Sequence, residues 1–300
     1  MKLEPAFLRG SYTPVVTPFR SGKVDYEQFA ALIERQIAGG SHGVVVAGST
    51  GEATSLTVKE REELFKTAVD TADGRIPVVA GAGSASYEET ACLCAFAEKA
   101  GVDALLIVTP YYVRPPQGGL VEYFIQIGKK TRLPLLIYHI PGRAAVSVTA
   151  QTVERIADET PSLAGIKHAV QELDLVSELI QRLGPDFRVF CGLESLSLPM
   201  LVIGAAGVMN AVGNLDPARV AALCNAAFSG KWDEAKKLHY ELFPIAQAIF
   251  LDSNPIPLKY MMARMGLLSN SEVRLPLTPL DGGKERILDD VLRNGGLLDH

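Results

Sequence analysis

Hydrophobic and polar positions follow two distinct patterns along this chain. Short runs of consecutive apolar residues are separated by longer stretches in which apolar residues recur every three to four positions. Consecutive apolar runs are typical of parallel strands covered on both faces, and the longer pattern is typical of amphipathic helices. The runs predict eight strands, at residues 12–17, 43–47, 77–82, 104–108, 135–138, 163–167, 188–191 and 207–210.

Helical patterns lie between these strands, at residues 26–38, 58–71, 87–99, 119–130, 150–158, 172–183, 195–204 and 217–228. Thr57 with Glu60 forms a capping-box pattern, and Asp216 before Pro217 is a typical helix start. Eight strand-then-helix units predict an α/β fold, a closed (β/α)8 TIM barrel. A doubly wound sheet is the alternative, but the glycine-rich first turn that would favour it is not found.

The alternation ends near residue 228. Three further helical patterns, at residues 232–251, 255–265 and 285–293, follow one another without a strand pattern between them. The sequence therefore predicts a catalytic barrel at residues 1–228 and a C-terminal helical region at residues 229–300. Such a helical extension fits a cap on the barrel or a contact between subunits.

Charge and composition exclude several partners. The net charge is −5 and no basic stretch stands out, which argues against a nucleic-acid partner. The most apolar segment, residues 196–212, is broken by Pro199, Gly204 and Gly207, so no membrane span is expected. The four cysteines and five histidines show no ligand spacing, so we expect no metal. Free, reduced cysteines favour a cytoplasmic protein.

One lysine stands out because it lies in an otherwise apolar strand. Lys167 is near the C-terminal end of the predicted strand at residues 163–167. Burial disfavours the charged ammonium and favours the free amine, which can attack a carbonyl and form a Schiff base. Alternatively, the ammonium extends to the rim of the barrel or pairs with a carboxylate.

Further polar residues follow the other strands, where the reacting groups of a (β/α)8 barrel lie. Gly48-Ser49-Thr50-Gly51 after the second strand fits a carboxylate cradle, with glycines that let backbone N–H groups approach a ligand, or an ordinary turn. Arg143 after the fifth strand could bind a carboxylate through two parallel hydrogen bonds, or lie on the surface.

The remaining candidates stand in or after strands. Tyr111 and Tyr112 follow the fourth strand and could pack or supply a phenol to a proton relay, and Tyr138 ends the fifth strand. In the eighth predicted strand, Val208 and Asn210 are candidate substrate contacts. Taken together, these residues place an amine, phenols, hydroxyls and a guanidinium at one face of the barrel.

Several motifs, taken in order, resemble those of one known family. They are Gly48-Ser-Thr-Gly-Glu52, Tyr111-Tyr112 with Pro-Pro-Gln-Gly-Gly, Tyr138-His-Ile-Pro-Gly-Arg143, Gly165-Ile-Lys167 and Asn254-Pro-Ile-Pro257. In this order they are similar to the dihydrodipicolinate synthase / N-acetylneuraminate lyase family. The likeness extends from residue 10 to about residue 280.

The resemblance implies the mechanism of a class I pyruvate aldolase, a lyase that works without a metal or an organic cofactor. Lys167 would form a Schiff base with pyruvate, and Tyr138 would act as the proton shuttle beside it. Ser49 and Tyr112 match the other hydroxyls of the family's relay. Tyr112 would reach in from a neighbouring subunit of a tight dimer.

The same resemblance assigns the substrate cradle and the assembly. Thr50 and the nearby backbone, with Gly48 and Gly51, would hold the carboxylate of pyruvate. A homotetramer built as a dimer of dimers is what the family implies.

The second substrate separates three hypotheses. Arg143 favours the synthase branch, which condenses pyruvate with L-aspartate 4-semialdehyde in lysine biosynthesis. Ala144 and His168 replace the threonine and glutamate usual in that branch, and Ser49 is commoner among the lyases. The alternative is therefore a catabolic 2-oxo-acid aldolase, hydratase-aldolase or dehydratase that resembles the lyases. A non-catalytic keto-acid-binding regulator is the third, but it would not require Lys167 and the hydroxyl relay.

The family's inhibitor pocket is only partly retained. It uses a histidine and an asparagine where this chain has Val58 and Ala85, whereas Tyr111 and Glu89 remain. The sequence therefore predicts an enzyme that lysine does not inhibit.

Overall fold

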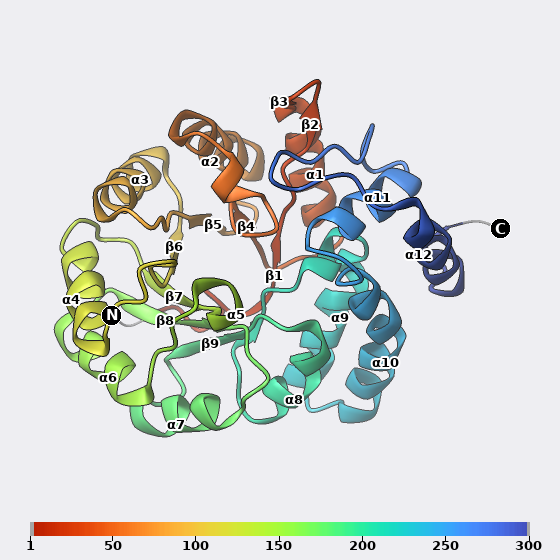
Figure 1. Cartoon of the computed structure of the whole chain (residues 1–300). Helices are drawn as coiled ribbons and strands as arrows, with labels where there is room; N and C mark the ends of the chain where they lie inside the picture. Colours follow the sequence, from red (N-terminus) through yellow and green to blue (C-terminus); the bar gives the residue numbers. More distant parts are fainter. Residues whose placement is uncertain (1–2, 299–300) are drawn as a thin grey trace.

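The computed structural model describes residues 3–298, and its strands close into one barrel (Figure 1). All neighbouring barrel strands are parallel, in the order β1-β10-β9-β8-β7-β6-β5-β4. They are β1 (Gly10–Pro14), β4 (Gly43–Val46), β5 (Val78–Gly81), β6 (Ala104–Val108), β7 (Leu135–His139), β8 (Leu163–His168), β9 (Arg188–Cys191) and β10 (Gly207–Val208). This topology confirms the (β/α)8 TIM barrel.

Helices surround the barrel in Figure 1 and connect successive strands. They are α1 (Tyr26–Ala38), α2 (Val58–Ala72), α3 (Tyr87–Ala100), α4 (Gln117–Gly128), α6 (Ala150–Glu159), α7 (Asp174–Leu183), α8 (Ser197–Val202) and α9 (Pro217–Phe228). The expected caps are present: Thr57 and Glu60 form both hydrogen bonds of a capping box, and Asp216 accepts from the backbone of Arg219. Local sequence therefore defines where these helices begin.

Short elements were missed or misjudged. The hairpin of β2 (Phe19–Arg20) and β3 (Lys23–Val24), the helix α5 (Pro141–Ala144) and the 3-10 turns η1 (Ala53–Ser55) and η3 (Ala211–Asn214) were not predicted. The predicted helix at residues 195–204 is wrong at both ends, because η2 (Glu194–Leu196) precedes α8. The eighth strand ends two residues early, where Asn210 turns its amide to Ser197. At the end of the eighth strand a tertiary hydrogen bond overrides the periodicity, whereas the other elements are too short to show one.

Pleating divides the strand residues between two cores. On β7, Leu136 and Tyr138 point into the barrel, whereas Leu135 and Ile137 pack against the surrounding helices. Inside the barrel, the rings of Tyr12 and Phe190 meet edge to face at 5.3 Å. Side chains fill the interior of the barrel, and ligand sites in this fold lie at the C-terminal ends of the strands, here called the upper end.

The C-terminal helices lie along one side of the barrel, coloured blue in Figure 1. They are α10 (Trp232–Ala248), α11 (Ile256–Arg264) and α12 (Gly282–Asn294), with no strand between them in the described residues. Helix α10 packs on α9, and α12 packs on α10 and α11.

A division of the chain at residue 228 stays a prediction, and residues 1–2 and 299–300 lie outside the described part. Within residues 3–298, no helix combines the length and apolar character needed to cross a membrane.

Candidate active site

Lys167 and Tyr138 lie side by side near the C-terminal ends of strands β8 and β7. They are paired in the register of β7 and β8, so both side chains point inward. Both are buried, and the Lys167 nitrogen lies 4.4 Å from the centre of the Tyr138 ring. The predicted nucleophile and the predicted proton shuttle therefore meet without any loop having to move.

Lys167 forms no hydrogen bond or ion pair with any residue in the described part of the chain, although only 4% of its surface is exposed. Gly192 makes room for it, because a Cβ there would lie 3.0 Å from the Lys167 Cε. The side chain lines a small cavity of about 60 Å³ together with Ser49, Thr50, Arg143, Glu194 and Asn254, among others. An amine without a partner, facing a cavity, is the arrangement that a nucleophile requires.

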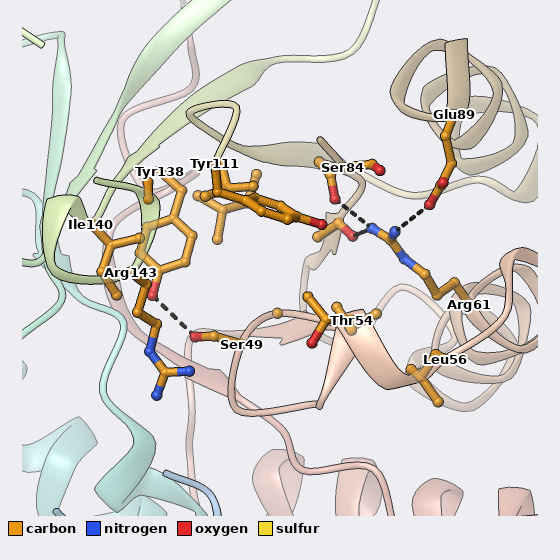
Figure 2. Close-up of a pocket in the computed structure, with 18 residues that line it drawn as sticks. Ser49, Thr54, Leu56, Arg61, Ser84, Glu89, Tyr111, Tyr138, Ile140 and Arg143 are labelled. Carbon is orange, nitrogen blue, oxygen red and sulfur yellow. Dashed lines mark hydrogen bonds and ion pairs between the residues drawn. The ribbon is translucent and has the colours of Figure 1, made fainter. Parts of the chain in front are cut away.

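Ser49 supplies a hydroxyl to the same place. Its Oγ lies 3.1 Å from the phenolic oxygen of Tyr138, a hydrogen bond drawn in Figure 2. Ser49 belongs to a tight turn after β4 in which the Gly51 and Glu52 N–H groups donate to the carbonyls of Gly48 and Ser49. The turn thus brings together two of the three hydroxyls that the sequence predicted as a relay.

The turn is anchored from the C-terminal helices. Glu52, with a left-handed φ of 56°, accepts from the ammonium of Lys259 on α11 at 2.5 Å, and both side chains are 1% exposed. Asn254 donates to the Thr50 hydroxyl at 2.9 Å. Glu52, Lys259 and Asn254 lay within or beside quoted motifs, yet the sequence did not reveal their pairing, because the partners are about 200 residues apart.

Arg143 lies on α5 at the mouth of the small cavity. It donates one hydrogen bond to the Asn254 carbonyl at 3.2 Å, and Arg143 is otherwise exposed. A guanidinium with free donors beside a cavity can bind a carboxylate. Its position is consistent with the predicted role in substrate binding.

A wider cavity of about 540 Å³ opens beyond Ser49 and Tyr138 (Figure 2). Its far wall holds the buried Arg61, which donates to the carbonyls of Gly81 and Gly83 and pairs with Glu89 at 3.4 Å. Burial lowers the pKa of Arg61, and the carboxylate of Glu89 acts against that change. The buried guanidinium of Arg61 is therefore the ion-pair partner of the Glu89 carboxylate.

Tyr112 does not approach its own site. Its side chain is 90% exposed, its φ is 73°, and it lines neither cavity, whereas Tyr111 lines the wider one. A left-handed backbone is uncommon for a bulky residue and suggests a constraint on this loop. The prediction that Tyr112 serves a neighbouring subunit stays a prediction.

The remaining candidates are spread around the site. Gly48 lines the wider cavity, and Thr50 lines the small one. Val208 is fully buried against the helices, and Asn210 is buried with its amide on Ser197. Neither lines the small cavity, so their predicted contact with substrate stays a prediction.

Two groups of ionisable side chains were missed as functional candidates. Glu194, which follows β9, is buried, and burial raises its pKa to about 7. His139 and His168, one residue beyond Tyr138 and Lys167, are joined through their Nδ1 atoms at 3.2 Å. The only signal was their position after a strand end, which many polar residues share.

No group of three or more histidine, cysteine, aspartate or glutamate side chains within residues 3–298 is placed to hold a metal ion. The groups gathered around Lys167 can instead supply a nucleophile, a phenol–hydroxyl pair and an anion-binding arginine. This set suits covalent catalysis at a carbonyl.

Comparisons with known proteins agree with this chemistry. The model of the "Dihydrodipicolinate synthetase family" matches residues 7–294. A 4-hydroxy-tetrahydrodipicolinate synthase of Thermus thermophilus is 44% identical over 97% of both chains, and one of Oleidesulfovibrio alaskensis is 42% identical over 96% of this chain and 99% of the relative. The crystal structure of dihydrodipicolinate synthase from Aquifex aeolicus superposes with a TM-score of 0.95 at 37% identity, covering 97% of this chain and all of that one. On sequence and structure alike, the chain belongs to the dihydrodipicolinate synthetase family.

Proposed function

We propose that this chain condenses pyruvate with L-aspartate 4-semialdehyde to form 4-hydroxy-tetrahydrodipicolinate, the reaction for which its relatives are named. The observation that carries the proposal is Lys167, a buried lysine without a charge partner, which faces a cavity beside Tyr138. The family resemblance and the identity of up to 44% to the named synthases support the choice of substrates.

Lys167 carries the covalent step. Its free amine attacks the keto carbon of pyruvate, a C–N bond forms, and one water leaves as a proton is taken up, which gives an iminium ion. The iminium withdraws electrons, so a proton leaves C3 and an enamine forms. The enamine carbon then attacks the aldehyde carbon of the second substrate, whose oxygen takes up a proton. The amino group of that substrate adds to the iminium carbon and the bond to the Lys167 nitrogen breaks, which closes the ring and releases the free amine of Lys167. No cofactor is needed, because the iminium itself accepts the electrons.

Tyr138 and Ser49 move the protons. The phenol lies over the lysine nitrogen and within 3.1 Å of the serine hydroxyl, so a proton can pass between the two oxygens. In the proposed assembly, Tyr112 of a second subunit completes this relay. The exposure of Tyr112 leaves it free to contact a second subunit, and the family resemblance supports a homotetramer built from tight dimers.

Two positively polarised places would bind the carboxylates. The turn that holds Thr50, with Gly48 and Gly51, lies beside Lys167 and would hold pyruvate. Arg143, at the cavity mouth, would hold the carboxylate of the semialdehyde. Four free cysteines, three of them buried, agree with the proposed cytoplasmic location.

The test is borohydride trapping in the presence of pyruvate, followed by intact mass measurement and peptide mapping. We expect one pyruvate-sized adduct on Lys167, none on the buried Lys259, which serves as an internal control, and fast turnover of aspartate semialdehyde. An adduct with negligible semialdehyde turnover would assign the protein to the catabolic 2-oxo-acid aldolases instead. Absence of any adduct would overturn the proposal.

A further inference from the structure

His139 and His168 are two buried histidines that the proposed reaction does not use. Each directly follows a proposed catalytic residue, His139 after Tyr138 on β7 and His168 after Lys167 on β8. The register of the two strands pairs Tyr138 with Lys167 and pairs the two histidines with each other. Because side chains alternate along a strand, the imidazoles point away from the barrel interior, on the face opposite to the two reactive side chains.

A hydrogen bond joins the two imidazoles. Nδ1 of His139 lies 3.2 Å from Nδ1 of His168, and the ring centres are 5.2 Å apart. Nε2 of His168 lies 2.6 Å from the carbonyl oxygen of Glu172, in the loop that follows β8. Beyond the paired histidines, the backbone adds a bond from the Ala169 N–H to the His139 carbonyl at 2.9 Å. The side chains thus connect the ends of β7 and β8 a second time, beside the backbone ladder.

The partners fix the positions of the protons in this pair. A carbonyl oxygen only accepts, so Nε2 of His168 carries a proton. Burial lowers the pKa of both imidazoles, so near neutral pH each ring is uncharged and holds one proton. Nδ1 of His168 is therefore the acceptor and Nδ1 of His139 is the donor. Nε2 of His139 is left with a lone pair that has no hydrogen-bond partner in the described chain.

The pair is costly to keep, because the buried Nε2 of His139 has lost its hydrogen bond to water without gaining another. Apolar side chains would avoid this cost, but they would not form a directional bond between the strands. A hydrogen bond between two buried rings holds both rings in one orientation. The bond therefore restricts how far β7 and β8 shift relative to each other at the level of Tyr138 and Lys167.

The spacing of Tyr138 and Lys167 matters for the proposed reaction. The Lys167 nitrogen lies 4.4 Å from the centre of the Tyr138 ring, and the iminium that forms on it must lie within reach of the phenol. A displacement of about 1 Å between reacting groups can lower a rate about a hundredfold. The pyruvate cradle around Thr50 follows β4, which is not a neighbour of β7 or β8 in the barrel. A shift between β7 and β8 therefore leaves the cradle in place.

We propose that the hydrogen bond between His139 and His168 positions Lys167 against Tyr138 for the proton-transfer steps. This role rests on the proposed Schiff-base function. Neither imidazole touches the reacting atoms, so both histidines are positioning residues. Loss of the bond slows proton removal from C3 of the bound pyruvate and leaves the affinity for pyruvate unchanged.

The test separates the two hydrogen bonds of His168. Asparagine places an amide atom near the position of Nδ1 of a histidine, and glutamine places one near the position of Nε2. His168→Asn therefore keeps the bond to His139 and loses the bond to Glu172, whereas His168→Gln does the reverse. The readout is the exchange of the C3 hydrogens of pyruvate in heavy water, followed by proton NMR, which requires the iminium and the proton shuttle but no second substrate.

We expect the maximal exchange rate to fall about thirtyfold in His168→Gln and to stay within about threefold of the wild type in His168→Asn. The pyruvate concentration that gives half the maximal rate should stay within about twofold in both variants. His139→Asn and His139→Gln repeat the comparison from the other strand, and they replace it where His168→Gln does not fold.

Denaturant unfolding of every variant identifies the temperature at which the exchange is measured on folded protein. A merely structural role would lower the stability and leave the exchange rates of the folded variants alike. Equal rates in the asparagine and glutamine variants would therefore overturn the positioning role alone. If the wild type exchanges no C3 hydrogen and forms no borohydride adduct on Lys167, both this inference and the Schiff-base function fail.

Discussion

Two buried lysines, Lys167 and Lys259, each lie over an aromatic ring but differ in their charged partners. They are 4% and 1% exposed, and each nitrogen lies over an aromatic ring, at 4.4 Å from the centre of Tyr138 and 4.1 Å from that of Phe19. Lys259 pairs with Glu52 and donates to the Glu272 carbonyl. Lys167 has no such partner in the described chain.

The difference separates the proposed roles of the two lysines, one in an ion pair and one as a nucleophile. The carboxylate of Glu52, 2.5 Å from the Lys259 nitrogen, favours the ammonium form, which has no lone pair for attack on a carbonyl. Burial lowers the pKa of Lys259, and the charge of Glu52 and its hydrogen bond act against that change. In the described chain no carboxylate is in ion-pair contact with Lys167, which agrees with its proposed role as the nucleophile.

Replacing Lys167 by alanine should have the largest effect on activity. We expect borohydride trapping to disappear and turnover to fall by at least about a thousandfold, because the nucleophile is lost. The free energy of unfolding should change by less than about 1 kcal/mol, since Lys167 forms no ion pair that would be broken. Denaturant unfolding checks the second part, and a strongly destabilised protein would contradict it.

Replacing Lys259 by methionine should lower the stability and leave adduct formation intact, the opposite of what is expected for Lys167→Ala. The variant leaves the buried carboxylate of Glu52 unpaired, so we expect it to lose about 3–5 kcal/mol of stability. The adduct on Lys167 should still form at a temperature where the protein is folded. The double variant Glu52→Gln/Lys259→Met should recover part of the loss, and equal losses in both variants would argue against the pair.

His139 and His168 offer a further comparison, because burial favours the neutral form of the His139 imidazole. His168 donates through Nε2 to the Glu172 carbonyl, and His139 meets its Nδ1. Burial, and then the charge of His168, lower the pKa of His139 to about 4. This pKa lies below the ordinary value near 6.5. Between about pH 4 and pH 6.5, the unfolded chain therefore binds more protons at His139 than the folded protein does.

The contribution of His139 is therefore fully present above about pH 6.5 and is lost as the pH falls towards 4. Over this range we expect it to account for about 3 kcal/mol of lost stability. Unfolding curves at several pH values check this, with His139→Asn as the comparison. An equally steep loss in the variant would contradict the assignment.

The aromatic rings under the two lysines provide a smaller test. Phe19 has no hydroxyl, whereas Tyr138 has one that meets Ser49. Tyr138→Phe gives Lys167 the kind of ring that lies under Lys259, so packing should survive while proton transfer is lost. We expect turnover to fall about a hundredfold, measured by steady-state kinetics. Activity close to the wild type would remove Tyr138 from the relay.

No effect at all is expected from free lysine. Arg61 already pairs with Glu89, the carboxylate that the resemblance assigns to an inhibitor pocket, and Val58 and Ala85 replace its polar residues. The carboxylate of Glu89 still faces the wider cavity, but without the histidine and the asparagine an added amino acid would meet only part of a binding site. Steady-state assays with sub-millimolar lysine check this, and inhibition would contradict the prediction.

Much of this molecule could be read from local patterns. Strands β6 and β9 and helices α1 and α9 begin and end where they were predicted, because their apolar periodicity and caps are local properties. The hairpin of β2 and β3 escaped prediction because its strands have two residues each, too few to show a period. Glu194 escaped because a single carboxylate after a strand carries no pattern.

The sequence by itself determined the (β/α)8 order and singled out Lys167, because pleating sends a lysine between apolar neighbours into the barrel. Only the tertiary structure decided which lysine is left without a partner. Glu52 and Lys259 are 207 positions apart, and Asn254 reaches Thr50 over 204 positions. Whether a buried amine is held as an ion or left free depends on such distant contacts, which local periodicity does not record.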